Sequence, residues 1–203
     1  MNSRWNHFRR VLKFIYAQFG IKRGKGAVLA LLLTPEELPL TDWSLRSTAT
    51  LRAALTGEVD EIALRARALG CITALGYFVN DLNLDRLTIR IEQLASADDA
   101  SNRVTSFDRK SRLELEPNMK VSEVRTASDL AIPGIAAMAG LEYNWTKSEN
   151  EVHNFKGLAG SFGPVYFLVT LNGINDVWRW DEVLKVTALQ AQKIIDNLGN
   201  TQT

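Results

Sequence analysis

Apolar residues recur at intervals of three and four along the start of the chain. Five residues keep this spacing: Trp5, Phe8, Leu12, Ile15 and Phe19. The spacing places them on one face of a helix, with Ser3 available to cap its start and Gly20 to end it. Basic residues fall largely on the other faces. The pattern therefore predicts an N-terminal amphipathic helix over residues 3–20.

Alternating and continuous apolar runs predict strands in the rest of the chain. They are expected at residues 27–33, 71–79, 87–94, 141–147, 152–158 and 165–171, with weaker signals at 112–115 and 120–126. The segment 87–94 alternates most clearly between apolar and polar positions. The segment 165–171 is the most apolar, which favours a central place in the sheet. Gly157, Gly160 and Gly163 are expected in a hairpin connection between strands.

Helical signals are fewer. Thr34 followed by Pro35 predicts a single helical turn over residues 34–37. Longer helices are expected at residues 47–69 with a break at Gly57, from Ser96 to about Phe107, and at 180–198. Together these elements predict an α+β fold, in which helices pack on an antiparallel sheet, with the N-terminal amphipathic helix in addition.

Charge divides the chain into two parts. Residues 1–25 carry seven basic side chains and no acidic one: Arg4, Arg9, Arg10, Lys13, Lys22, Arg23 and Lys25. Since the whole chain of 203 residues has a net charge of +1, residues 26–203 carry −6. We therefore expect a basic arm with linker over residues 1–25 and a single α+β domain over residues 26–203. The balanced total argues against a general nucleic-acid binder.

Few residues suggest catalysis. The single cysteine, Cys71, starts an apolar run and is expected to be buried, and the two histidines, His7 and His153, are far apart in sequence. Spacings typical of metal sites, phosphate-binding loops and hydrolase nucleophiles are not found, so no cofactor or metal is expected. An enzyme whose site combines dispersed residues, namely Asp98, Asp99, His153 and Arg179, is an alternative.

The segment Trp178-Arg179-Trp180 is the most unusual short pattern of the body. Two tryptophans beside a guanidinium group can form a stacking platform or a cation–π site. The simpler interpretation is that Trp180 anchors the last helix in the core while Trp178 covers a loop. With His153, these three residues are the ligand-binding candidates of the sequence.

The arm offers the clearest sign of a partner. Its candidate contact residues are Trp5, Phe8, Arg9, Arg10, Leu12, Lys13, Ile15 and Phe19. A helix with aromatic residues on one side and basic residues elsewhere suits an anionic membrane surface. The same stripe could instead dock on the body, bind a protein partner or pair with a second copy into a homo-oligomer. The lone cysteine favours a cytoplasmic location, peripheral to the membrane if the arm binds there, and leaves export open.

The layout of the body resembles a known family of domains. The run from Leu31 to Pro39 followed by Trp43, the strand-to-helix junction at residues 87–100, and the turn at Ile132-Pro133-Gly134 carry this likeness. They are similar to the sensor-like domains of actinobacterial lipoproteins and of PknH-type receptor kinases. The family's paired cysteines are missing here. The resemblance implies a non-enzymatic ligand- or partner-binding domain with its site beside the sheet, and an oligomeric structural subunit is the alternative.

Overall fold

The structure is a computed structural model. It describes residues 25–39, 41–52, 61–107, 119–126, 130–149, 151–174 and 178–199. The arm and its amphipathic helix over residues 3–20 lie outside the described residues, as does the weak strand signal at 112–115. The division into an arm and a body therefore stays a prediction, and the fold below is that of the body.

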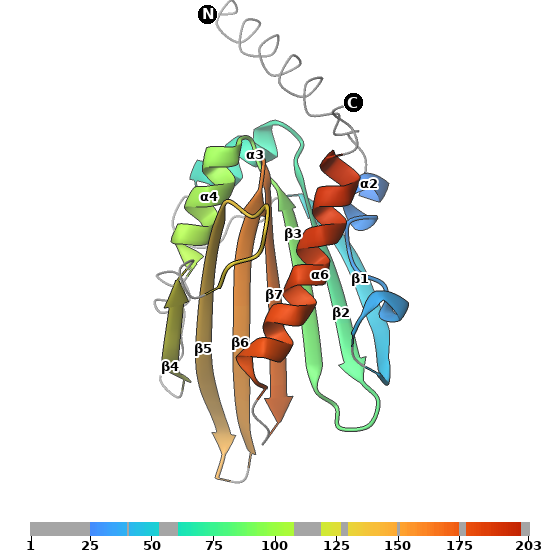
Figure 1. Ribbon diagram of the computed structural model, residues 1–203, viewed down its shortest axis with the longest axis vertical. Coiled ribbons are helices and arrows are strands. Elements are labelled where there is room, and N and C mark those ends of the chain that lie inside the picture. The colour runs from blue at the N-terminus through green and yellow to red at the C-terminus, as the bar shows by residue number, and fades with distance from the viewer. Residues whose placement is uncertain are drawn as a thin grey trace, which may run out of the picture.

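Seven described strands form one antiparallel sheet (Figure 1). In chain order they are β1 (Trp43–Arg52), β2 (Ile72–Asn80), β3 (Arg86–Gln93), β4 (Met119–Thr126), β5 (Ala137–Ser148), β6 (Glu151–Phe162) and β7 (Val165–Ile174). Their order across the sheet is β1-β2-β3-β7-β6-β5-β4. The apolar strand β7 lies in the middle, as predicted, and β1 and β4 are the edges.

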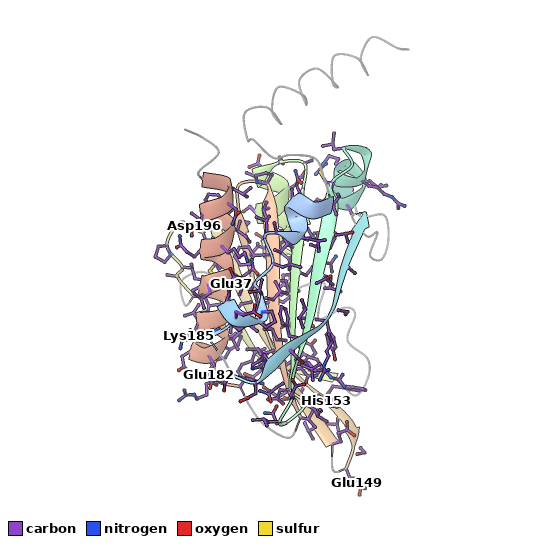
Figure 2. All side chains as sticks on the ribbon, turned by 90° about the vertical axis from the view of Figure 1, so that its right-hand side faces the viewer. Glu37, Glu149, His153, Glu182, Lys185 and Asp196 are labelled. Carbon is purple, nitrogen blue, oxygen red and sulfur yellow. The ribbon has the colours of Figure 1, made fainter. Side chains whose placement is uncertain are left out.

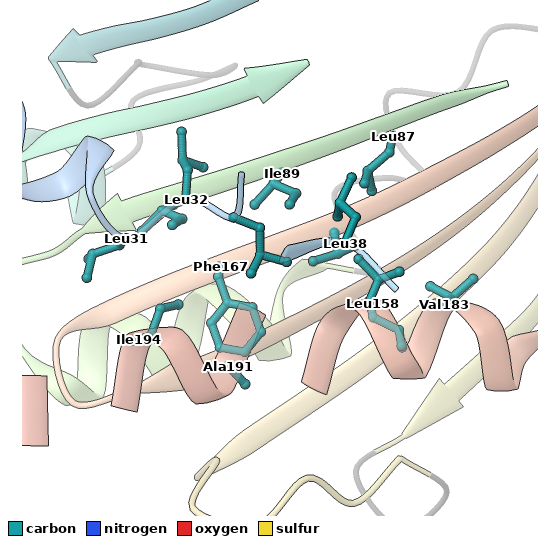
Figure 3. Packing of buried hydrophobic residues seen from close by; sticks show 14 of the residues in the cluster. Leu31, Leu32, Leu38, Leu87, Ile89, Leu158, Phe167, Val183, Ala191 and Ile194 are labelled. Carbon is teal, nitrogen blue, oxygen red and sulfur yellow. The ribbon is translucent and has the colours of Figure 1, made fainter. Parts of the chain in front are cut away.

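Helices cover both faces of this sheet. The described ones are α2 (Lys25–Leu29), the 3-10 turn η1 (Pro35–Glu37), α3 (Glu61–Ala68), α4 (Ala97–Thr105) and α6 (Trp180–Gly199). Helix α6 runs along one face, where it buries a large apolar cluster together with residues 28–38 (Figures 1 and 3). Helices α3 and α4 cover a smaller cluster that includes Tyr166. Because Tyr166 and the neighbouring Phe167 of the larger cluster point to opposite sides of β7, the two clusters lie on opposite faces.

The α+β class and most elements are confirmed. Ser96 caps α4 by accepting the backbone N–H of Asp99 at 3.0 Å, and Glu37 accepts the N–H of Thr34 at 2.7 Å across η1. Helix α6 ends within one residue of its predicted bound. The strands β5, β6 and β7 are longer than predicted. Their backbone pairing continues through buried polar residues and glycines, which do not follow the apolar pattern used to predict the strands.

Three local predictions are wrong. Residues 47–52 are strand rather than helix, because they pair with β2, and the described helix of this region is α3, Glu61–Ala68. Residues 27–29 of the first apolar run belong to the short helix α2 instead of a strand, and the leucines after it fill the core beneath α6. Gly157 and Gly160 lie within β6, whereas Gly163 alone of the three takes the turn, with φ of +51°.

Candidate binding site

Two turns mark one end of the sheet, which we call the distal end. They are the β2–β3 turn, residues 81–85, and the turn between β5 and β6. At the opposite end α2 begins and α6 finishes (Figure 1). Figure 2 shows His153 near the distal end, above Glu149 of the β5–β6 turn. The side chains at this end fall into groups on the two faces of the sheet and at the β2–β3 turn.

Four rings from two strands form a block on the face that α4 covers farther up. The block comprises Tyr143, Trp145, His153 and Phe155. Tyr143 and Phe155, which are cross-strand partners, stack with ring centroids 4.7 Å apart. Trp145 lies 5.0 Å from the ring of His153. Apart from His153, the rings are only partly buried, so the block presents an aromatic surface.

His153 is held by polar partners on both ring nitrogens. Its Nε2 lies 2.8 Å from Oε1 of Glu151, and its Nδ1 lies 3.3 Å from Nδ2 of Asn172 on β7. A neutral ring that donates from Nε2 to Glu151 would accept from Asn172 at Nδ1. Two buried polar atoms of this group, Oδ1 of Asn172 and Nε1 of Trp145, have no hydrogen-bond partner. Such atoms are costly to leave unpaired.

Tyr143 supplies a further donor to the block. Burial raises the pKa of its phenol to about 12. The hydroxyl therefore keeps its proton at physiological pH and can donate a hydrogen bond. The combination of flat apolar surface and fixed polar groups suits binding, which requires both contact area and orientation.

The β2–β3 turn is held in one conformation by its own side chains. Oδ1 of Asn80 accepts the backbone N–H groups of Leu82, at 2.9 Å, and Asn83, at 3.2 Å. The amide of Asn83 donates to Oδ2 of Asp85 at 2.9 Å. The backbone N–H of Asp81 donates to the carbonyl oxygen of Asp42 at 2.8 Å, which joins the turn to the chain before β1.

This turn also concentrates backbone strain and exposed apolar surface. Asp42, with φ of 65°, and Leu84, with φ of 64°, are the only non-glycine residues in the described part of the chain with positive φ. A left-handed leucine costs about 1–2 kcal/mol. Leu82 and Leu84 are 77% and 60% exposed, more than any other large apolar side chain that the structure describes. Strain retained by hydrogen bonds around exposed leucines is typical of a contact surface rather than of a spacer loop.

The turn and the ring block are connected. The backbone N–H of Ile174, at the end of β7, donates to Oδ1 of buried Asp85 at 3.3 Å. Ile174 is the cross-strand partner of His153. A chain of hydrogen bonds and strand pairs thus runs from the exposed leucines to His153. The distal end therefore forms one unit, built from β2, β3, β5, β6 and β7.

Leu84→Asn is expected to stabilise the protein by about 1 kcal/mol, because asparagine tolerates the left-handed region better than leucine. Leu82→Asn is the matched control, since Leu82 is as exposed but has no positive φ. Urea unfolding of both variants measures the difference. Equal stability of the two variants would show that position 84 stores no strain.

The predicted segment at residues 178–180 lies on the other face. Trp178 packs against Trp43, with ring centroids 6.0 Å apart, and both belong to the α6 side of the core. Trp180 also packs there, whereas Arg179 is 71% exposed and pairs with Asp181 and Glu182. The two indoles therefore do not enclose the Arg179 guanidinium. The sheet separates this segment from His153.

A buried ion pair lies beside Trp180, and sequence reasoning did not identify it. Nζ of Lys156, a side chain only 3% exposed, lies 2.7 Å from Oε2 of Glu142. The same Nζ lies 3.4 Å from Oδ1 of Asn154 and 5.7 Å from the centre of a Trp180 ring. Lys156 and His153 point to opposite faces of β6 because they are three residues apart. The ion pair therefore stabilises β6 on the face opposite the ring block.

The remaining candidate residues have structural partners. Asp99 is buried and lies 2.5 Å from the guanidinium group of Arg65, which ties α4 to α3, while Asp98 is exposed. Cys71 is buried, as expected. No group of metal-ligating side chains occurs among the described residues. None of the helices that the structure describes is long and apolar enough to cross a membrane.

Comparison with known proteins gives a match in structure alone. No protein-family profile and no curated protein matches the sequence. The solved extracellular domain of PknH from Mycobacterium tuberculosis matches with a TM-score of 0.56 and 12% identity, over 87% of this chain and 97% of that one. A Pseudomonas aeruginosa protein of unknown function has a TM-score of 0.32 and 13% identity over 80% of this chain and 85% of its own, which is too low to support an argument. The chain therefore shares the fold of the PknH extracellular domain, in agreement with the layout of its sequence.

Proposed function

We propose that this chain is a non-catalytic, sensor-like binding domain that contacts its ligand or partner protein with the distal end of the sheet. The observation that carries the proposal is the β2–β3 turn, where side-chain hydrogen bonds hold the loop, Leu84 has left-handed backbone and two leucines face solvent. The ring block around His153 extends this surface by the aromatic area of its partly buried rings. The fold shared with the extracellular domain of PknH agrees with a binding role.

The enzyme alternative has less support. The candidate residues contact different neighbours: Asp99 contacts Arg65, Arg179 contacts two acids in the first turn of α6, and His153 contacts Glu151 and Asn172. General acid–base catalysis requires its groups within reach of one reacting atom. His153 beside Glu151 has the form of an oriented base, but its described ring contacts include no nucleophile.

Nuclear magnetic resonance tests the binding proposal with defined probes. We expect that a panel of short peptides, monosaccharides and phosphorylated metabolites contains compounds that shift the indole N–H of Trp145 and the backbone N–H of Leu82 and Asn83. Leu82→Ser should weaken the binding of such a compound at least about tenfold, as the loss of a buried apolar side chain predicts. Val152→Ser is the control, because Val152 is exposed on the opposite face of β6. Shifts confined to other surfaces would contradict the proposal.

A second proposal concerns the arm, and it rests on sequence alone. We propose that residues 3–20 attach the protein to an anionic membrane surface, since the segment combines an apolar stripe with basic residues and has no acid. Reversal of charge at Arg9, Arg10 and Lys13 to glutamate should abolish co-sedimentation with phosphatidylserine vesicles at low salt. Lys185→Glu, on the exposed side of α6, should leave it unchanged. Failure of the wild type to bind would leave docking on a protein or self-association as the role of the arm.

A further inference from the structure

The described helices cover only part of the α4 side of the sheet. Helix α4 packs mainly against β5, β6 and β7, and it lies toward the end opposite the distal end (Figure 1). The segment 28–38, which contacts β1 and β2, belongs to the core on the α6 side. Three side chains of β2 point to the α4 side and are only half-buried: Leu75, Tyr77 and Val79. Beside α4, β2 and β3 therefore present their side chains on a partly open face.

Arg86 lies on this open face, in one row with the ring block. Arg86 of β3 pairs with Asn172 of β7, and Asn172 pairs in turn with Phe155 of β6. Phe155 pairs with Tyr143 of β5. Directly paired residues of an antiparallel sheet point to the same face, and neighbouring strands lie about 4.8 Å apart. The Cα atoms of Arg86 and Phe155 are therefore about 10 Å apart, so that one small ligand can reach both side chains.

The charge of Arg86 is not neutralised within the fold. Its side chain is exposed, and it has no acidic partner among the residues that the structure describes. Two other arginines of the neighbouring strands differ, because Arg46 pairs with Asp81 and Arg90 pairs with Glu92. The guanidinium group of Arg86 is therefore available to an anion from outside the chain.

The acids on this side of the strands are already engaged. Glu92 is buried between Arg90 and Arg103. Glu151 lies 2.8 Å from Nε2 of His153 through its Oε1. Glu142 points to the opposite side, where it pairs with a lysine. The open face beside α4 thus carries an excess of positive charge, although residues 26–203 as a whole carry −6.

We propose that this face binds a small molecule that carries an anionic group on an aromatic ring, with Arg86 holding the anion and the ring block contacting the ring. The proposal rests on the proposed function, since it names the ligand class of the distal end. A guanidinium group binds a carboxylate or a phosphate through two parallel hydrogen bonds, and aromatic side chains favour an aromatic ligand. The half-buried hydroxyls of Thr88 and Thr170, which are cross-strand partners in the next row, add hydrogen-bonding groups. The acidic body disfavours a polyanion such as nucleic acid, which leaves a small ligand.

Three probes that share a ring and differ in charge test this ligand class. They are indole-3-acetate, which is an anion, indole-3-acetamide, which is neutral, and tryptamine, which is a cation. Each is titrated into the isotope-labelled full-length chain, and nuclear magnetic resonance follows the backbone N–H of Arg86 and the indole N–H of Trp145. We expect indole-3-acetate to bind at least about tenfold more tightly than tryptamine, as a hydrogen bond between charged groups predicts.

Variants assign the preference to one side chain. Arg86→Gln should remove the preference for the anion and leave thermal unfolding unchanged, because the side chain is exposed. Arg86→Lys should keep part of it, since lysine retains the charge but not the paired hydrogen bonds. Arg46→Gln is the control, because Arg46 is an exposed arginine with an acidic partner of its own. Phe155→Leu should weaken the binding of all three probes by a similar factor.

Several results would overturn the proposal. They are equal affinities of the three probes, a preference for the anion that survives Arg86→Gln, the same loss in Arg46→Gln, and the absence of shifts with all three probes. Charge-independent binding of the probes to the ring block would overturn the anionic ligand and leave the distal end as the binding site. The proposed function itself fails only if the wider panel of peptides, sugars and metabolites also shifts other surfaces alone.

Discussion

Lys156→Met is expected to lower the free energy of unfolding by about 3 kcal/mol, because it removes the ammonium group that lies 2.7 Å from the mostly buried carboxylate of Glu142. Methionine keeps the apolar stem of the lysine, so the loss reflects the missing charge and hydrogen bonds rather than a large cavity. Urea unfolding followed by tryptophan fluorescence measures the change.

A double variant that also replaces Glu142 distinguishes the cost of losing one charge of the pair from the cost of a packing defect. Lys156→Met combined with Glu142→Leu removes both charges of the pair, and we expect stability to return to within about 1 kcal/mol of the wild type. Lys185→Met, on the exposed side of α6, should change stability by less than about 0.5 kcal/mol. If Lys156→Met were as harmless as that control, the ion pair would have no structural role.

This ion pair bears on function through strand β6. Lys156 fixes β6 against β5 from the α6 side, and Phe155 and His153 of the same strand carry the ring block on the opposite side. A rigid strand keeps these rings and the hydrogen bonds of His153 in place. We therefore expect that Lys156→Met also weakens any ligand contact made by the ring block, without contacting the ligand itself.

Sequence reasoning recovered the elements whose side chains differ between their two faces. Strand β3 alternates because Leu87 and Ile89 enter the core and Arg86 and Thr88 do not, and α6 shows its stripe for the same reason. The middle of strand β1 was not predicted as strand. Its side chains are exposed on both faces of the sheet, so apolar and polar residues do not alternate along it. Its strand state comes from pairing with β2, which is twenty or more residues away and leaves no local signal.

The candidate site could be predicted only in part. His153 was identifiable as a histidine in a strand, and Glu151 as a neighbour on the same face. Asn172 and Trp145 required the registers of β6 with β7 and β5, which turn patterns do not determine. Lys156 could not be distinguished from an exposed strand lysine in the sequence, because its burial depends on the packing of α6 over β6. The β2–β3 turn did carry a signal, since two leucines alternate there with asparagine and aspartate, which otherwise favour polar turns.

Gly160→Ala is expected to lower the free energy of unfolding by about 3 kcal/mol, through overpacking of the core between β6 and β7. A Cβ atom at this position would lie 2.5 Å from Cζ of Phe167, a fully buried ring, so the ring or a strand must move. Phe167→Leu should remove the clash, and the double variant should be more stable than the sum of the two single losses predicts, by at least about 1 kcal/mol.

Gly157→Ala is the control. The position lies on the same strand but on the other face, its new Cβ atom would meet its nearest atom at 3.2 Å, and the substitution should therefore cost clearly less stability. Thermal unfolding of the four variants and the wild type measures these differences, and simple additivity would show that the absent side chain of Gly160 and the ring of Phe167 are not complementary.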